Sequence, residues 1–160
     1  MIQQAFLADA DATEAMGCQL AQSMPPHAVL FLGGDLGAGK SSLARAMLRR
    51  LGVTGTIRSP TYTLLERYQL HDGEAVHMDL YRIAEAGELE FLGLEDFVRE
   101  ARLMLVEWPE RAPTALPPAD IELGLAVEGE GRRVTLRANS NNGHCWLARL
   151  NEMAAASSSS

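Results

Sequence analysis

One stretch of the sequence combines residues that typically bind phosphate groups. In residues 31–43, FLGGDLGAGKSSL, Gly34 and Gly39 are separated by four residues, and Lys40 and Ser41 follow directly. The glycines allow backbone N–H groups to curve around phosphate oxygens, and the helix that begins here points its positive end at them. Lys40 is expected to reach the terminal phosphates of a nucleotide, and the Ser41 hydroxyl to bind Mg²⁺. The segment therefore predicts a P-loop.

Lys40 is the one lysine among the 14 basic residues of the chain, and the other 13 are arginines. A guanidinium is a broad planar fork, which does not replace a compact ammonium inside a tight ring of backbone amides. The choice of lysine at this position therefore fits phosphate binding.

Two predicted strands each end in a carboxylate that could serve a nucleotide. Asp79 ends the run AVHMD, and Glu107 ends the more apolar run LMLVE. Hydrolysis or transfer of a phosphoryl group needs a carboxylate near Mg²⁺, and a further group that orients the attacking water. The sequence does not decide which of the two residues binds the metal and which one orients the water.

Three other residues near these motifs have open roles. In RSPTYTL, Pro60 stiffens a loop that leaves the Thr61 hydroxyl available to sense a γ-phosphate or a metal, although a plain turn is an equal alternative. His77 is interpreted as a packed strand histidine. Trp108, next to Glu107, could stack near a nucleotide or pack against the core.

The elements that must position these residues alternate between strands and helices. A buried strand, AVLFLGG, precedes the loop, and a helix, KSSLARAMLRRLG, follows it. Further segments are predicted as a first strand (QAFLA), a helix ending near Met24, a hairpin around HDG, helical pieces within residues 84–101, a strand (RLMLVEW) and a closing hairpin around GEG. This order predicts an α/β, single-domain P-loop NTPase with a central, mostly parallel sheet flanked by helices and a late antiparallel hairpin.

The chain is predicted to have one catalytic domain and a short extension. Residues 1–138 would form the P-loop ATPase domain. Residues 139–160 would form a loosely attached helix followed by a disordered, serine-rich tail.

Composition restricts the class of protein further. The 160 residues carry a net charge of −7, which argues against a protein that grips DNA or RNA by itself through a basic surface. Two cysteines are too few for a disulfide framework or a zinc site. Neither a secretory signal nor an apolar run long enough to span a bilayer is visible, so a cytoplasmic protein without membrane contact is expected.

Several motifs together resemble one bacterial family. The segments GGDLGAGKSSL, RSPTYTLLERY, HMDLYRI, ELEFLGLEDF and LVEWPER occur in the order and at the spacing typical of the TsaE (YjeE) family, from about residue 10 to about residue 125. The family usually has two threonines after the P-loop lysine, where this chain has Ser41 and Ser42. Because serine keeps the hydroxyl group, metal binding is expected to persist.

The resemblance implies a function and a set of site residues. Members bind ATP with Mg²⁺, hydrolyse it slowly, and act with the TsaD and TsaB proteins, which modify adenosine 37 of tRNAs reading ANN codons with threonylcarbamoyl. Contact with tRNA would be indirect, through that assembly. Catalytic roles would fall on Lys40, Thr61, Asp79 and Glu107, metal binding on Ser41, Asp79 and Glu107, and nucleotide binding on Gly34, Asp35, Leu36, Gly37, Ala38, Gly39, Lys40, Ser41, Ser42 and Trp108.

Other functions for a P-loop remain to be weighed. A GTP switch would need the guanine-reading pattern Asn-Lys-x-Asp, which is absent from the sequence. A small-molecule kinase would need an arginine-rich lid, and no such cluster is seen in the later segments. A nucleotide-sensing scaffold without turnover stays open, because Asp79 and Glu107 permit catalysis without setting its rate.

Overall fold

The computed structural model describes residues 2–83 and 100–158. Its elements, in chain order, are β1 (Ile2–Leu7), α1 (Ala10–Ser23), β2 (Ala28–Gly33), α2 (Lys40–Arg50), β3 (Leu65–Leu70), β4 (Gly73–Asp79), β5 (Leu103–Glu107), the short 3-10 helix η2 (Pro109–Arg111), β6 (Ile121–Glu128), β7 (Gly131–Ala138) and α4 (Asn141–Ser158). The predicted helical pieces within residues 84–101, and with them the ELEFLGLEDF motif, fall mainly on residues 84–99, outside the described part.

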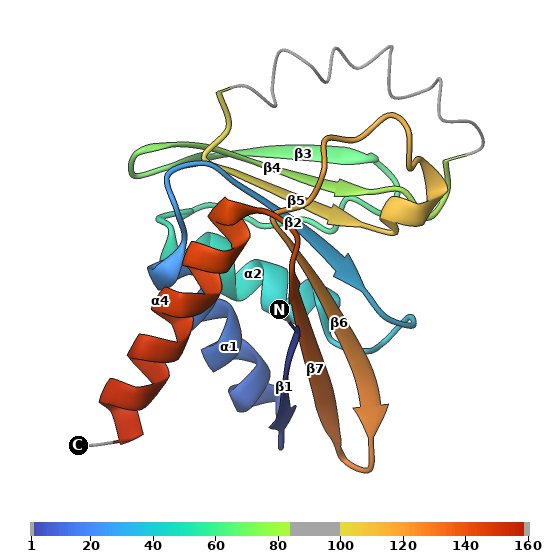
Figure 1. Cartoon of the computed structure of the whole chain (residues 1–160). Helices are drawn as coiled ribbons and strands as arrows, with labels where there is room; N and C mark the ends of the chain where they lie inside the picture. Colours follow the sequence, from blue (N-terminus) through green and yellow to red (C-terminus); the bar gives the residue numbers. More distant parts are fainter. Residues whose placement is uncertain (1, 84–99, 159–160) are drawn as a thin grey trace.

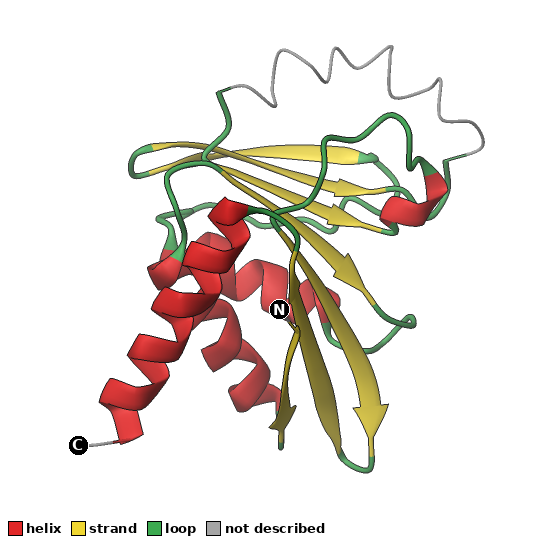
Figure 2. Cartoon of the chain, viewed as in Figure 1, coloured by secondary structure: helices red, strands yellow, loops and turns green. Residues whose placement is uncertain are grey.

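The strands of the described residues form one seven-stranded sheet in the order β1-β7-β6-β2-β5-β4-β3 (Figures 1 and 2). The four central strands, β6, β2, β5 and β4, are parallel to one another. Antiparallel pairing is confined to the two sides, where β3 joins β4, and β7 joins both β6 and β1. The predicted α/β fold, with a parallel centre and a late antiparallel hairpin, is confirmed.

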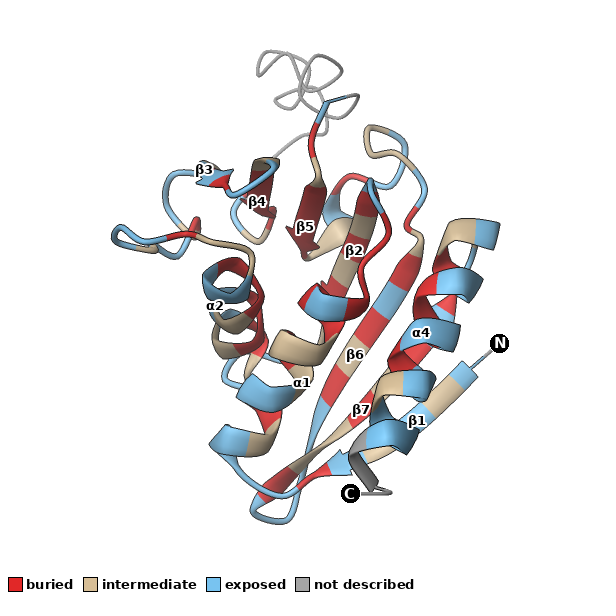
Figure 3. Ribbon diagram, turned by 90° about the vertical axis from the view of Figure 1, so that its left-hand side faces the viewer, coloured by how far each residue is buried: buried red, intermediate tan, exposed pale blue. Residues whose placement is uncertain are grey.

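Burial explains why the central strands are so apolar. All five residues of β5 are buried, because this strand lies between two parallel neighbours and is covered on both faces (Figure 3). In β2 buried and half-buried residues alternate. The carboxyl ends of β2, β4 and β5 meet at one edge of the sheet, as the paired positions Leu32, Glu107 and Asp79 show.

Helices α1, α2 and α4 cover one face of this sheet (Figures 1 and 3). Asp9 starts α1 by accepting a hydrogen bond from the Ala12 N–H at 2.9 Å. Helices α1 and α2 approach each other closely at Gly17, where a Cβ would lie 2.7 Å from the Leu43 carbonyl oxygen and 2.8 Å from the Ala46 Cβ. This contact fixes α2, and with it the loop that precedes α2, against the rest of the layer.

The opposite face of β2, β4 and β5 is covered by the segment that follows β5. Its residue Ala112 belongs to a second core cluster that also contains strand residues Val76, Met78, Met104 and Val106, and the half-buried Ala115 and Leu116 pack against this cluster. The chain therefore folds back over the sheet directly after Glu107. This return path determines where Trp108 lies.

The prediction that the C-terminal helix is loosely attached is wrong. Trp146 and Leu147 are 0% exposed, and Leu150 is 3% exposed, within the main core. The Trp146 indole N–H donates to the Leu20 carbonyl oxygen of α1 at 3.0 Å. Helix α4 extends to Ser158, so that the serine run predicted to be disordered begins inside the helix. A domain boundary at residue 138 is untested and stays a prediction.

Candidate functional site

The predicted phosphate-binding loop joins the end of β2 to the start of α2. Gly34, Gly37 and Gly39 have φ angles of 129°, 82° and 107°, which lie in the left-handed region that favours glycine. A Cβ at Gly34 would also collide with the Leu125 carbonyl oxygen of β6. Gly39 caps α2 without a side-chain hydrogen bond, so the first N–H groups of the helix can face an anion.

Lys40 begins α2, and 5% of its surface is exposed. Its Nζ donates to the Gly34 carbonyl oxygen at 2.6 Å and lies 4.0 Å from the centroid of the Trp108 ring. The carbonyl and the indole face both attract a cation. The ammonium is therefore held beside the loop, where the P-loop prediction requires it.

The two predicted carboxylates occupy neighbouring strand ends. Asp79 of β4 is paired in register with Glu107 of β5, and the two residues are 5% and 3% exposed. Asp79 accepts a hydrogen bond from the Thr61 hydroxyl at 3.2 Å and one from the Tyr81 N–H at 2.9 Å. The prediction that Thr61, Asp79 and Glu107 gather at one place is therefore consistent with the structure.

One pocket of about 250 Å³ brings most of the predicted site together. It is lined by Leu36, Gly37, Gly39, Lys40, Ser41, Ser42, Thr61, Asp79, Glu107 and Trp108. Three predicted nucleotide-binding residues do not line it. The Gly34 carbonyl binds Lys40, the exposed Asp35 accepts from the Ala38 N–H through its own carbonyl, and Ala38 is 1% exposed. Their roles in nucleotide binding stay predictions.

Trp108 adopts an unusual backbone conformation at the edge of this pocket. Its φ of 59° and ψ of 48° are left-handed, which is uncommon for a bulky residue and often accompanies a functional position. The conformation turns the chain directly after Glu107. The indole ring contacts the Tyr81 ring at 5.0 Å between centroids as well as the Lys40 ammonium.

His77 has a partner that sequence reasoning missed. The residue is buried within β4, as predicted, but its Nε2 lies 2.8 Å from Glu107 Oε2. Because side chains alternate along a strand, His77 and Asp79 lie on the same face of β4. This shared face is the sequence signal that could have placed His77 near the two predicted carboxylates.

Arg132 holds the predicted phosphate-binding loop in place, although no sequence motif indicated this role. From β7 its Nε donates to the Ala38 carbonyl oxygen at 2.9 Å, and its Nη2 donates to the Gly37 carbonyl oxygen at 3.3 Å. A third bond joins Nη1 to the Gly131 carbonyl oxygen at 2.8 Å. Arg132 thus ties the middle of the phosphate-binding loop to the β6–β7 hairpin.

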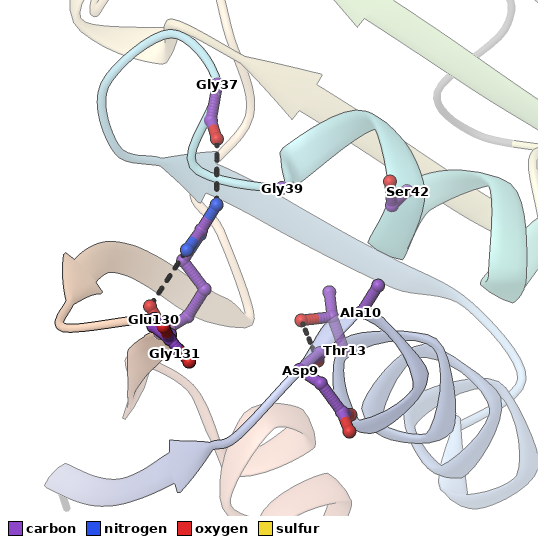
Figure 4. Close-up of a pocket in the computed structure, with 9 residues that line it drawn as sticks. Asp9, Ala10, Thr13, Gly37, Gly39, Ser42, Glu130 and Gly131 are labelled. Carbon is purple, nitrogen blue, oxygen red and sulfur yellow. Dashed lines mark hydrogen bonds between the residues drawn. The ribbon is translucent and has the colours of Figure 1, made fainter.

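A second pocket, of about 340 Å³, lies on the other side of the loop. Figure 4 shows Gly37 and Gly39 on one side of it, Asp9 with Ala10 and Thr13 of α1 on another, and Glu130 with Gly131 on a third. Gly37, Gly39 and Ser42 line both pockets. The two cavities therefore share these loop residues as a common wall.

Comparison with known proteins places these features in a family. The profile described as "Threonylcarbamoyl adenosine biosynthesis protein TsaE" matches residues 7–135. The chain belongs to the TsaE family. This result confirms the resemblance inferred from the sequence motifs.

Two TsaE relatives and one solved structure indicate how far the likeness extends. The "tRNA threonylcarbamoyladenosine biosynthesis protein TsaE" of Haemophilus influenzae is 42% identical over 115 residues, which cover 72% of this chain and 73% of that protein. The protein of the same name from Bacillus subtilis is 34% identical over 132 residues, 81% of each chain. The crystal structure of Bacillus subtilis YdiB matches with a TM-score of 0.82 and 25% identity, covering 96% of both chains.

The pocket of about 250 Å³ around Lys40 is called the phosphate pocket, after its predicted ligand. The TsaE match includes every residue that lines it. Helix α4 lies beyond the matched residues, whereas the structural likeness to YdiB covers nearly the whole chain. Among residues 2–83 and 100–158, no helix has the length and apolar character needed to cross a membrane.

Proposed function

We propose that this protein binds ATP with Mg²⁺, hydrolyses it slowly, and acts as an accessory factor in the threonylcarbamoyl modification of adenosine 37 in tRNAs reading ANN codons. The modification is named in the descriptions of the family and of its relatives. The nucleotide chemistry rests on the site itself. One observation carries it, namely that Lys40, Thr61, Asp79 and Glu107 converge on one pocket at the start of α2.

The pocket offers the oxygen donors that Mg²⁺ prefers. No group of three or more His, Cys, Asp and Glu side chains in the described residues could hold a metal by itself. Mg²⁺ at nucleotide sites usually takes one or two carboxylates and completes its shell with phosphates and water. The Ser41 hydroxyl and the Asp79 carboxylate line the pocket together and fit that pattern.

The second pocket suits the nucleoside half of ATP. Ser42 borders both cavities, at the position where the chain of phosphates would continue toward the ribose. A volume of about 340 Å³ lies within the range of small-molecule sites. With the phosphates against α2, the adenosine would lie between the start of α1 and the β6–β7 hairpin.

The residues of the pocket divide the work of hydrolysis. Bound Mg²⁺ would neutralise negative charge on the phosphates. Lys40 would do the same from the loop, and the amides of Gly37 and Gly39 would hold the phosphate oxygens. Glu107 would orient the water for in-line attack on the γ-phosphate, and Asp79 together with Thr61 would hold the metal and sense the γ-phosphate.

Partners are proposed from the same family relation. We expect this protein to associate with TsaD and TsaB in a manner that depends on ATP, with tRNA contacted through the assembly. Purified proteins mixed with ATP or ADP and separated by size should co-elute in one nucleotide state. Failure to associate in either state would contradict the partnership.

A genetic test addresses the whole proposal. Deletion of the gene should remove the threonylcarbamoyl nucleoside from bulk tRNA, and the wild-type gene should restore it while a Lys40→Ala gene should not. Unchanged tRNA in the deletion strain would overturn the proposal. In vitro, tight ATP binding without any hydrolysis would instead favour a nucleotide-sensing scaffold.

A further inference from the structure

A buried polar pair lies at the edge of the phosphate pocket, which Glu107 lines and His77 does not. His77 and Glu107 are each 3% exposed, and their side chains meet at 2.8 Å between Nε2 and Oε2. His77 is paired in register with Leu105, so Glu107 is its diagonal neighbour on the adjoining parallel strand. Such a diagonal lies within reach of long side chains on the same face of a sheet.

The charge of Glu107 decides which atom of the pair donates. When Glu107 is ionised, its carboxylate only accepts hydrogen bonds, so the His77 Nε2 carries the proton and donates it to Glu107. The other ring nitrogen, Nδ1, is buried without a hydrogen-bond partner among the described residues. An apolar side chain would fill the same place in β4 without leaving a polar atom unpaired. Packing alone therefore does not account for a histidine here.

The two carboxylates of the site are held by separate donors. The Thr61 hydroxyl binds Asp79, and the His77 ring binds Glu107. Asp79 and Glu107 are paired in register, and separate donors keep these two buried carboxylates in distinct orientations. The Tyr81 N–H adds a second hydrogen bond to Asp79.

We propose that His77 is a positioning residue, which holds the Glu107 carboxylate in the orientation that orders the attacking water. This inference rests on the proposed ATP hydrolysis. His77 does not line the phosphate pocket, so it acts through Glu107. The loop residues that bind the phosphates lie on other elements. Loss of the imidazole should therefore slow the chemical step without weakening nucleotide binding.

The kinetic test compares two substitutions of similar polarity in the full chain. In His77→Gln the side-chain amide nitrogen can replace Nε2, whereas in His77→Asn it reaches only the position of Nδ1. We expect His77→Asn to lower kcat on the order of 100-fold, with the KM for ATP unchanged, because a small misplacement of a catalytic group costs about that much. His77→Gln should recover most of the rate. Equal kcat values for the two variants would overturn the positioning role.

Non-additivity gives a second kinetic test. When His77 acts only through Glu107, adding His77→Asn to a Glu107→Gln variant should change kcat little further. Two effects that multiply would contradict the proposal. Thermal melts of each variant separate a loss of folded protein from a loss of rate.

A spectroscopic test needs no nucleotide. In protein labelled with ¹⁵N-histidine, the signals that disappear in His77→Gln should show a protonated Nε2. The opposite tautomer would overturn the hydrogen bond to Glu107 and the inference with it. If the wild-type protein does not hydrolyse ATP, both the proposed hydrolysis and the catalytic role of His77 and Glu107 are contradicted. The tautomer of His77 would still show whether His77 donates a hydrogen bond to Glu107.

Discussion

Asp79 and Glu107 stand opposite each other in register at the carboxyl ends of two parallel strands, and both are buried. A pair of buried carboxylates on neighbouring strands is costly unless donors or a cation stabilise the charges. Each has a donor of its own, and the Lys40 ammonium lines the same pocket. The arrangement thus gives the two carboxylates different surroundings, and we infer different roles from it.

Exchange of each carboxylate for its amide should separate these roles. Asp79→Asn should raise the Mg²⁺ concentration needed for half-maximal ATP hydrolysis, on the order of tenfold, because a neutral amide binds the metal more weakly. Glu107→Gln should lower kcat by about 10² to 10⁴, the usual contribution of a group that orients or deprotonates a nucleophile, with little effect on the Mg²⁺ requirement. Steady-state hydrolysis measured over a Mg²⁺ titration distinguishes the two.

The opposite result is equally clear. If Glu107→Gln shifts the Mg²⁺ requirement and Asp79→Asn changes only kcat, the two assignments must be exchanged. Wild-type rates in Lys40→Ala as well as in both amide variants would remove the pocket from consideration as a hydrolytic site.

The Lys40 ammonium should not be replaceable by another cation. Lys40→Ala should weaken ATP binding about 10-fold to 100-fold, because a charge-assisted hydrogen bond contributes roughly 1.5–3 kcal/mol. Lys40→Arg should weaken it to a similar degree, since the guanidinium is too wide for the loop. Arg45→Ala, an exposed position on the same helix, provides the control. Isothermal calorimetry gives the affinities, and an Arg45→Ala loss equal to that of Lys40→Ala would point to general electrostatics.

Because Arg132 holds the loop by hydrogen bonds, its removal should lower the affinity for ATP even though Arg132 lies away from the expected phosphate position. Arg132→Ala should weaken ATP binding about 10-fold, since it removes two hydrogen bonds from a charged donor to the carbonyls of Gly37 and Ala38. The neighbouring Arg133 pairs with Glu128 at the surface. Arg133→Ala should therefore leave the affinity unchanged, and equal effects of the two variants would contradict a specific hold on the loop.

Those parts of the candidate site that depend on residues within a single segment could be predicted from the sequence. The loop between β2 and α2 could be predicted because glycine, lysine and serine at that spacing follow a strand and precede a helix. The two carboxylates could be predicted because each ends an apolar run, and parallel strands bring such ends to one edge. Their pairing in register was not predicted, since the strand order is set by tertiary packing.

What the sequence did not indicate depends on contacts between distant segments. Arg132 is 94 residues from Ala38 in the sequence, and the β6–β7 hairpin brings it to the loop. His77 was predicted to be buried, but its hydrogen bond to Glu107 follows from the β4–β5 register. Helix α4 was predicted to be loosely attached, whereas Trp146, Leu147 and Leu150 pack into the main core and Trp146 bonds to Leu20 of α1.

That attachment leads to a last prediction, on stability. Trp146→Ala should lower the free energy of unfolding by about 3–5 kcal/mol, the usual cost of removing a buried large aromatic side chain. The loss of the indole bond to the Leu20 carbonyl adds to this. Cys145→Ala changes an exposed neighbour on the same helix and should have an effect within about 0.5 kcal/mol. Urea unfolding of the full chain measures both, and similar small effects would restore the view that the helix is loosely attached.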